Sequence, residues 1–208
     1  MLYTVIKRLL DIFIAVLAII IGFPLFLLVS LAIWLEDQGS IIYSQVRVGK
    51  DRAPFRIYKF RSMVENADEI LFSNSQLYEK MRSGSHKVEN DPRITKVGKF
   101  IRKYSIDEFP QFFNVLKGEM SFVGPRAYRP DELEMCENER LDRREQLENI
   151  LKVKPGITGL WQVSGRSNLS FEERLNLEER YALSHSLLLD FFIILKTPIA
   201  VIKAEGAV

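Results

Sequence analysis

The apolar positions divide the chain into one long uncharged segment near the N-terminus and a remainder in which apolar and charged positions are mixed. The uncharged segment is the 24 residues 12–35, between Asp11 and Glu36. As one straight helix it would reach about 36 Å, more than the ~30 Å hydrocarbon core of a bilayer. A secretory signal has a shorter apolar region and a small-residue cleavage site, neither of which this sequence contains. The pattern therefore predicts a membrane anchor over residues 1–36.

Pro24 stands at the middle of this anchor, close to Gly22. A central proline removes a backbone hydrogen bond and kinks or breaks a helix. Two arrangements follow, a kinked spanning helix and a re-entrant helix–break–helix, and helix propensity does not separate them. Lys7 and Arg8 precede the uncharged segment, which places the N-terminus in the cytoplasm. The many Lys and Arg and the single cysteine of the remainder are typical of a cytoplasmic domain, which favours re-entry.

Residues 37–208 have the pattern of an α/β domain that is mostly helical with a small β-hairpin. Two β-prone runs at 40–43 and 55–60 flank a turn-rich segment and predict the hairpin. The polar residues 84–92 predict a mobile loop.

Helical spacing predicts the other elements of this domain. The expected helices cover residues 64–82, 94–103, 131–152 and 171–185. The third of them is highly charged, so we expect most of its surface to be solvated. The apolar tail at 187–202 is interrupted by charges and a proline, which predicts an interfacial amphipathic helix and not a spanning one.

Composition narrows the possible functions. The net charge of +2 is too small to indicate nucleic-acid binding. A single cysteine, Cys136, excludes an intrachain disulfide and has no metal-ligand spacing around it. His86 and His185 also lack partners at metal-ligand spacing, so neither is expected to bind a metal.

Residues 105–111, with the sequence SIDEFPQ, carry two adjacent carboxylates, Asp107 and Glu108. One interpretation is a helix start, because Ser105 and Glu108 match a capping box. Pro110 fits this start only if Asp107 is the N-cap, where the proline falls in the first turn. The helix N-terminus would then keep Asp107 ionised and could bind phosphate. Because adjacent helical residues point about 100° apart, we expect the two carboxylates to have different roles.

Three other segments present groups that suit phosphate. Lys59 and Arg61 are expected on one face of the second β-run, either solvated or in contact with phosphate. Arg126 follows a Gly-Pro turn, which suits bidentate phosphate recognition but is also typical of a surface turn. Residues 154–166 contain three glycines and could let the backbone approach a nucleotide diphosphate, or could form ordinary turns.

Asp190 lies within the apolar tail. An acid in such a position is costly unless it is paired. We expect either a role beside a metal site or a salt bridge, for which Lys196 is one candidate.

These segments, taken in order, resemble one family. The motifs are KFRSM, the run that starts at residues 91–93, SIDEFPQ, GEMSFVGPR, KPGITGLWQVSGR and LDFFIILKT. They are similar to those of the monotopic phosphoglycosyl transferases, also called the bacterial sugar transferase family, from residue 7 to about residue 203. The chain departs from the common pattern at Ile106 and Phe109, where leucine is usual, and at Phe23, where some relatives have serine. It looks like the small catalytic-core form.

The resemblance implies an enzyme that transfers a sugar 1-phosphate from a UDP-sugar to undecaprenyl phosphate and releases UMP. This would be the first membrane step of polysaccharide or glycan assembly, on the cytoplasmic face of the bacterial inner membrane. The sequence GLWQVSGR resembles that of family members that use galactose or glucose more than that of members that use N-acetylated sugars. The resemblance also implies Mg²⁺ as cofactor and membrane lipids as partners, and it allows a homodimer.

The resemblance assigns roles residue by residue. Asp107 matches the nucleophile, which forms an aspartyl-phosphosugar intermediate, and would be a metal ligand; Glu108 matches its dyad partner. Lys59 and Asp190 match positions needed for activity, and Pro24 matches the helix break. The positions that contact phosphate or nucleotide are matched by Arg102, Arg126, Arg166 and Gln162. Two alternatives stay open: a membrane-attached glycosyltransferase that releases UDP, and a non-catalytic scaffold of a polysaccharide assembly complex.

Overall fold

The computed structural model describes residues 2–83, 91–139 and 141–203. The helices are α1 (Leu2–Asp37), α2 (Ala67–Ser73), α3 (Ser75–Ser83), α4 (Lys96–Lys103), α5 (Gln111–Lys117), α6 (Pro130–Glu139), α7 (Leu141–Ile150), α8 (Leu160–Ser164), α9 (Phe171–Ser184) and α10 (Leu187–Lys203). The strands are β1 (Ile42–Val48), β2 (Pro54–Phe60), β3 (Ser121–Val123) and β4 (Gly156–Thr158). The mostly helical class with a small β content is confirmed. Most of the expected loop at 84–92 lies outside the described residues.

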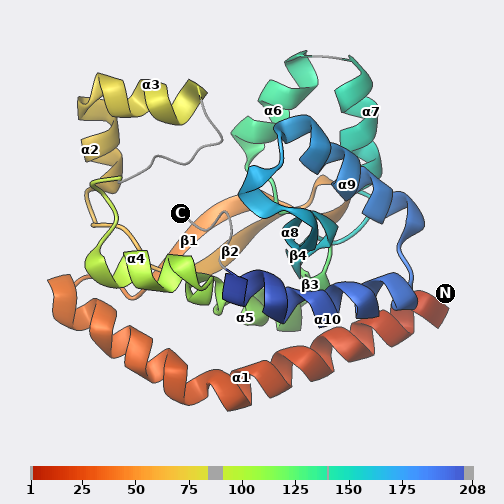
Figure 1. Cartoon of the computed structure of the whole chain (residues 1–208), viewed down its shortest axis with the longest axis horizontal. Coiled ribbons are helices and arrows are strands. Elements are labelled where there is room, and N and C mark those ends of the chain that lie inside the picture. The colour runs from red at the N-terminus through yellow and green to blue at the C-terminus, as the bar shows by residue number, and fades with distance from the viewer. Residues whose placement is uncertain (1, 84–90, 140, 204–208) are drawn as a thin grey trace.

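Helix α1 is continuous and contains Pro24 in its interior. Figure 1 shows that α1 bends near its middle and that both arms rise towards the side on which the other elements lie. The expected break is therefore a bend within one helix. A proline removes one hydrogen bond and its ring strains one turn, while the bonds on either side can continue. By length and composition, α1 could cross a membrane.

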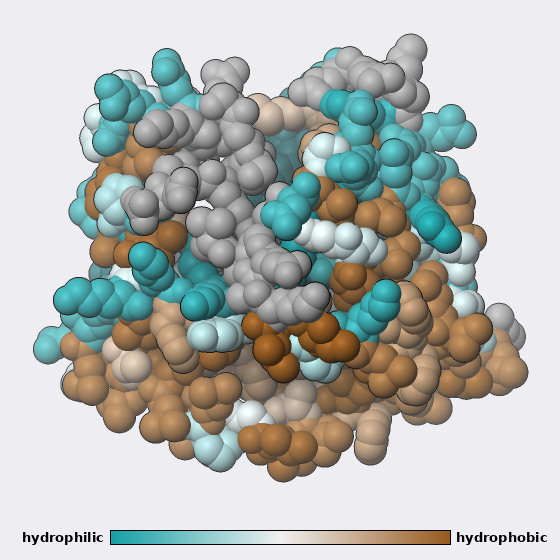
Figure 2. All heavy atoms as spheres, in the orientation of Figure 1, coloured by the Kyte–Doolittle hydropathy of each residue, from teal (hydrophilic) through white to brown (hydrophobic). Residues whose placement is uncertain are grey.

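The outward face of α1 is apolar and exposed, which is the reverse of a helix on a soluble protein. Ile20, Ile21 and Leu28 are 66–70% exposed, whereas the charged Asp11 is buried. Exposed apolar side chains of α10, such as Leu188, extend this surface. Figure 2 shows the result as a hydrophobic belt along the edge of the molecule where α1 lies.

The predicted hairpin is confirmed, and its first strand is longer than expected. Strands β1 and β2 pair antiparallel from Ile42 opposite Phe60 to Val48 opposite Pro54. Phe60 packs with Val29 and Ile33 of α1 and so fixes the end of the hairpin on the anchor.

A second sheet was not predicted. Strands β3 and β4 are parallel and pair Ser121 with Gly156 and Val123 with Thr158. No strand was expected at 121–123, and residues 154–166 were expected to form a nucleotide-binding loop or ordinary turns. Runs of three residues are too short to show the two-residue alternation of a strand. The segment at 154–166 also contains helix α8.

The single, largely solvated helix expected at 131–152 is wrong. The structure has two helices there, α6 and α7, which pack together, and α7 also packs against α9 (Figure 1). Their inward side chains, including Leu133, Cys136 and Leu147, are buried in a cluster with Tyr128. Residues 64–82 likewise form two helices, α2 and α3. The helices expected at 94–103, 171–185 and 187–202 are confirmed as α4, α9 and α10.

Candidate active site

The two adjacent carboxylates lie on a 3₁₀ turn, η2 (Ile106–Glu108), and not at the start of an α-helix. Ser105 has a left-handed backbone conformation with a φ of 56°, and its side chain caps nothing. Helix α5 begins only at Gln111, with Pro110 at its N-cap position. Both the capping-box interpretation and Asp107 as N-cap are therefore wrong. Without a capping role, the Glu108 side chain can reach the hairpin.

A cavity of about 620 Å³ opens beside this turn. Its walls include all but one of the predicted catalytic and substrate-binding residues: Lys59, Arg102, Asp107, Glu108, Arg126, Gln162 and Arg166. They come from β2, α4, η2, the segment after β3, α8 and the turn that follows α8. The fold thus brings together residues that are more than 100 positions apart in the chain.

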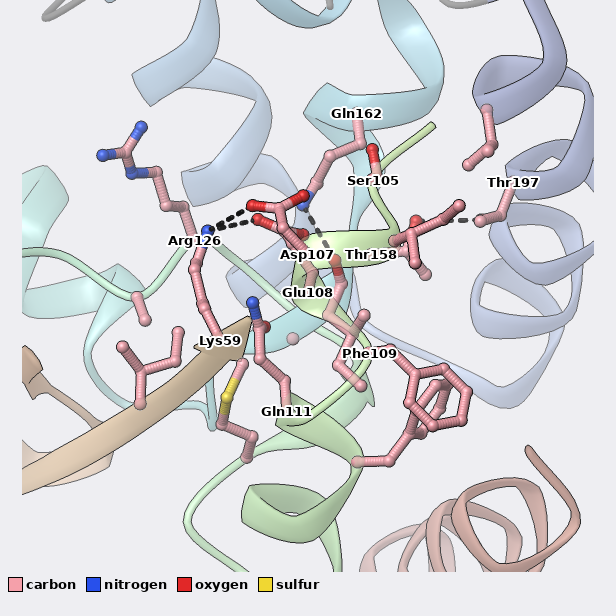
Figure 3. A pocket seen from close by; sticks show the side chains of 18 of the residues that line it. Lys59, Ser105, Asp107, Glu108, Phe109, Gln111, Arg126, Thr158, Gln162 and Thr197 are labelled. Carbon is pink, nitrogen blue, oxygen red and sulfur yellow. Dashed lines mark hydrogen bonds and ion pairs between the residues drawn. The ribbon is translucent and has the colours of Figure 1, made fainter. Parts of the chain in front are cut away.

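Lys59 joins the two carboxylates (Figure 3). Its Nζ atom lies 2.7 Å from Oε1 of Glu108 and 3.9 Å from Oδ2 of Asp107. Arg61, expected on the same strand face, follows the end of β2 and instead pairs with Asp37 and Glu65. Only Lys59 of this pair therefore serves the cavity.

The two carboxyl groups differ in acidity. Burial raises the pKa of Asp107 to about 6, although Lys59 acts in the opposite direction. Burial also acts to raise the pKa of Glu108, but Lys59, Arg126 and Arg166 together hold it below its ordinary value. The lowered pKa of Glu108 favours its charged form beside Lys59. Asp107 is the more basic and less tightly paired carboxylate, which suits a nucleophile.

We expect nucleotide release from a UDP-sugar to require ionised Asp107. Because the ionised form predominates only above the pKa, the rate should fall as the pH drops below about 6. UMP release should be measured without lipid acceptor, so that the phosphate of the acceptor, which also ionises near this pH, does not contribute. A rate that is constant from pH ~5 to ~7.5 would contradict this assignment.

The η2 turn, which carries Asp107 and Glu108 and is called the carboxylate turn below, lies against the bend of α1. The aromatic ring of Phe109 occupies the space beside Gly22, where an added Cβ would lie 2.3 Å from Phe109 Cζ. Phe109 also packs on Phe26 of the second arm, with ring centroids 6.2 Å apart. The anchor is therefore part of the support of the carboxylate turn.

The glycines of the 154–166 segment allow close backbone packing beside the cavity. A Cβ at Gly159 would lie 2.2 Å from the carbonyl oxygen of Gly124 and 2.7 Å from Oε1 of Gln162. Gln162 donates to the carbonyl of Ile157 at 3.4 Å. Arg166 follows Gly165 in a left-handed conformation with a φ of 53°. This packing places Gln162 and Arg166 on the cavity wall.

Asp190 is the predicted site residue that the cavity does not include. Its carboxylate accepts from Lys7 at 2.8 Å, Tyr3 at 3.1 Å and Tyr181 at 2.6 Å. The expected salt bridge to Lys196 is wrong, because Lys196 lies over the ring of Phe192. Asp190 joins α10 to α9 and to the first arm of α1, and its contribution to activity stays a prediction.

We expect Asp190→Asn to lower the thermal unfolding temperature of the detergent-solubilised protein. Removing one partner of a buried ion pair typically costs about 3–5 kcal/mol, because the other charge remains buried. Lys196→Met, which removes an exposed lysine of the same helix, should have little effect. Equal unfolding temperatures for Asp190→Asn and the wild type would contradict a stabilising role for this contact.

The carboxylate turn also bears on metal binding. Among the described residues, no group of three or more His, Cys, Asp and Glu side chains could hold a metal. Mg²⁺ usually binds through one or two carboxylates together with substrate phosphates and water. Asp107 and Glu108 on the wall of one cavity fit that mode of binding.

Two further cavity residues were not found from the sequence. Arg47 on β1 and Arg129 just before α6 both line the cavity. Arg126, which the sequence did indicate, points away from the carboxylate turn and pairs with Glu132 at 2.9 Å (Figure 3). No local motif marks Arg47 or Arg129. Arg129 follows Arg126 by three positions, whereas only the fold brings Arg47 to the same cavity.

Comparison with known proteins identifies the family. A model of the family described as bacterial sugar transferase matches residues 2–204. The exopolysaccharide production protein ExoY of Sinorhizobium fredii is 42% identical over 205 residues, which are 97% of this chain and 87% of that protein. The undecaprenyl-phosphate galactose phosphotransferase of Salmonella typhimurium is 41% identical over 97% of this chain and 41% of its own length.

A third relative is the UDP-glucose:undecaprenyl-phosphate glucose-1-phosphate transferase of Klebsiella pneumoniae, 38% identical over 93% of this chain and 39% of its own length. This chain thus spans most of ExoY and less than half of the two larger relatives. Because the family match extends from the first arm of α1 to the end of α10, the chain, anchor included, belongs to the bacterial sugar transferase family.

Proposed function

We propose that this protein transfers a hexose 1-phosphate from a UDP-sugar to undecaprenyl phosphate and releases UMP. The observation that carries the proposal is the buried Asp107 with a raised pKa, 3.9 Å from Lys59, in a cavity lined with arginines. Relatives named for galactose or glucose transfer to the same lipid support this substrate class.

In the first step, an oxygen of Asp107 attacks the β-phosphorus of the UDP-sugar. The bond from that phosphorus to the bridging oxygen breaks, and the electron pair leaves with UMP, so that the sugar phosphate is bound to Asp107. Lys59, Arg102 and Arg126 stabilise the negative charge that develops on the phosphoryl oxygens. When bound, Mg²⁺ supplies further positive charge beside the diphosphate, and Asp107 and Glu108 are the residues that would hold it.

In the second step, a phosphate oxygen of the lipid attacks the phosphorus bound to Asp107. The bond between that phosphorus and the carboxylate oxygen breaks, which restores Asp107 and gives a polyprenyl diphosphosugar. Two steps suit two substrates that arrive from different phases, one from water and one from the bilayer. Glu108 stays paired with Lys59 and keeps the ammonium group of Lys59 directed at the reacting phosphate.

The anchor is proposed to be re-entrant, with the domain on the cytoplasmic face of the inner membrane. Both arms of α1 are bound to the same domain, which supports this arrangement. In the first arm, Lys7 pairs with Asp190. At the other end, Glu36 accepts from the backbone N–H groups of Lys96 and Val97 at 2.7 and 3.1 Å. The two contacts support an arrangement in which both ends of α1 lie on the same side of the bilayer.

Labelling of intact cells tests this topology. Leu2→Cys and Ser40→Cys place thiols at the two ends of α1, while the native Cys136 is buried. We expect a membrane-impermeant thiol reagent to label neither position before the cells are opened and both afterwards. Labelling of Ser40→Cys alone in intact cells would indicate a spanning helix.

The hydrophobic belt and α10 are proposed to lie at the membrane interface, in contact with lipid. The exposed apolar side chains of α10, such as Leu188 and Ile202, are 80% and 77% exposed. This exposure supports contact with lipid, since a soluble protein rarely leaves so much apolar surface in water. A homodimer stays a prediction.

The nucleotide product separates the proposal from its alternatives. We expect UMP from the purified protein with undecaprenyl phosphate and a panel of UDP-sugars, fastest with UDP-galactose or UDP-glucose. UDP as product would indicate a glycosyltransferase that passes the sugar alone. No turnover with any UDP-sugar would favour a non-catalytic scaffold.

A further inference from the structure

One end of the cavity has three arginines around a single buried carboxylate. Glu132 of α6 lies 2.9 Å from Arg126 and 3.7 Å from Nε of Arg129 through Oε1, and 3.7 Å from Nη1 of Arg47 through Oε2. All four residues line the cavity. The two-step scheme above gives a role to Arg126 but none to Arg47 or Arg129.

The charges of this cluster do not balance. The side chains of Arg47, Arg126 and Arg129 are only 13%, 28% and 20% exposed, and Glu132 is 7% exposed. Glu178, which is also buried, lies near Arg126, but burial raises its pKa to about 7, so it offsets only part of that charge. Asp131 also pairs with Arg129, but it is 62% exposed, so solvent screens it. Burial, together with the charge of Arg126, lowers the pKa of Arg47 to about 10. Burying more positive than negative charge raises the free energy of the folded state, and an anion bound in the cavity would offset this cost.

The position of the cluster indicates which anion it meets. Figure 3 shows Arg126 on one side of the carboxylate turn, and Thr197 of α10 on the other side. Figure 1 shows α6, which carries Glu132, at the opposite end of the molecule from α1. The cluster therefore lies on the side of the turn that a water-soluble substrate reaches.

We infer that Arg47, Arg126 and Arg129 form a second phosphate subsite, which binds the phosphate group that leaves with the nucleotide. This inference rests on the proposed function. The β-phosphate lies at Asp107 and Lys59, and the neighbouring phosphate lies at the arginine cluster. Arg126 pairs with Glu132 and lines the same cavity as Asp107 and Lys59, so the two subsites share one cavity. Glu132 is the internal counter-charge that holds the arginines together.

The test is to measure UMP binding to the protein in detergent by calorimetry. We expect Arg47→Gln and Arg129→Gln each to raise the Kd for UMP roughly tenfold. A hydrogen bond to a charged group accounts for a change of that order. Arg56→Gln is the matched control, because Arg56 lies on the same hairpin, is exposed and does not line the cavity. Its Kd should equal that of the wild type. Thermal unfolding of each variant verifies that it folds.

A second measurement uses the wild-type protein and does not depend on the folding of any variant. UMP should protect Arg47 and Arg129 from the arginine reagent phenylglyoxal, as mapped by mass spectrometry, and should leave Arg56 unprotected. Unchanged modification of both cavity arginines, or unchanged UMP binding by the folded variants, would overturn the inference.

The same variants are titrated with a short-chain polyprenyl phosphate in detergent, where we expect no change. Weaker binding of the lipid phosphate alone would assign the subsite to the lipid and overturn its assignment to the nucleotide. The proposed function fails separately, if the wild type neither binds UMP nor releases it from a UDP-sugar. If it does both while Arg47→Gln and Arg129→Gln behave as Arg56→Gln does, only the inference fails.

Discussion

Asp107→Asn will reduce UMP release from a UDP-sugar by at least about a thousandfold, in line with the loss of a nucleophile in other covalent mechanisms. The amide has nearly the same shape as the carboxylate but is a poor nucleophile. The measurement is the initial rate of UMP release by purified protein. Asp51→Asn is a suitable control, because the Asp51 side chain is 73% exposed and does not line the cavity.

The same substitution should not destabilise the fold. The folded state raises the pKa of Asp107 from its ordinary value of 3.8 to about 6, because burial disfavours the charged form. The native state then binds more protons than the unfolded state between these two values, and stability contributed by this group decreases as the pH rises through that range. An uncharged Asn avoids this cost at pH 7, so its unfolding temperature should equal or exceed that of the wild type. An inactive but destabilised Asp107→Asn would indicate a structural role, and an active one would remove Asp107 as nucleophile.

Lys59→Gln will reduce the rate of UMP release by about 10²–10³-fold, the range found when a preorganised donor to developing negative charge is removed. Lys59 also lowers the pKa of Asp107, so its loss should move the acid limb of the pH profile to higher pH. An unchanged rate together with an unchanged acid limb would contradict both roles.

The double variant Lys59→Gln with Glu108→Gln separates charge pairing from catalysis. Lys59→Gln alone leaves the Glu108 carboxylate without its 2.7 Å partner, which should lower the unfolding temperature. Removing the Glu108 charge as well should restore much of the stability but not the activity. Recovery of activity in the double variant would mean that Lys59 acts only by neutralising Glu108.

The sequence predicted best those features whose evidence lies within a single segment of the chain. The uncharged run at 12–35 predicts the anchor, and helical spacing predicts α4, α9 and α10. The site could be anticipated because its motifs occur in a recognisable order, and the fold brings Lys59, Asp107 and Arg126 to one cavity.

The remaining features depend on contacts between distant segments, which no local pattern encodes. Asp190 and Lys7 are 183 positions apart, so Lys196, six residues away, was the nearer candidate from sequence alone. Strands β3 and β4 are too short for periodicity, and the division of 131–152 into two helices follows from packing on α9. Arg47 lies in no recognisable motif, and only its position on β1 brings it to the cavity.

The central claim is a covalent sugar phosphate on Asp107, and a single-turnover experiment without lipid acceptor tests it most directly. Purified protein is mixed with UDP-galactose or UDP-glucose and Mg²⁺, the nucleotide released is quantified, and the peptide containing residues 105–111 is analysed by mass spectrometry. The account predicts up to one equivalent of UMP per protein and a hexose phosphate attached to Asp107. Release of UMP only after undecaprenyl phosphate is added, with no modified peptide, would contradict it.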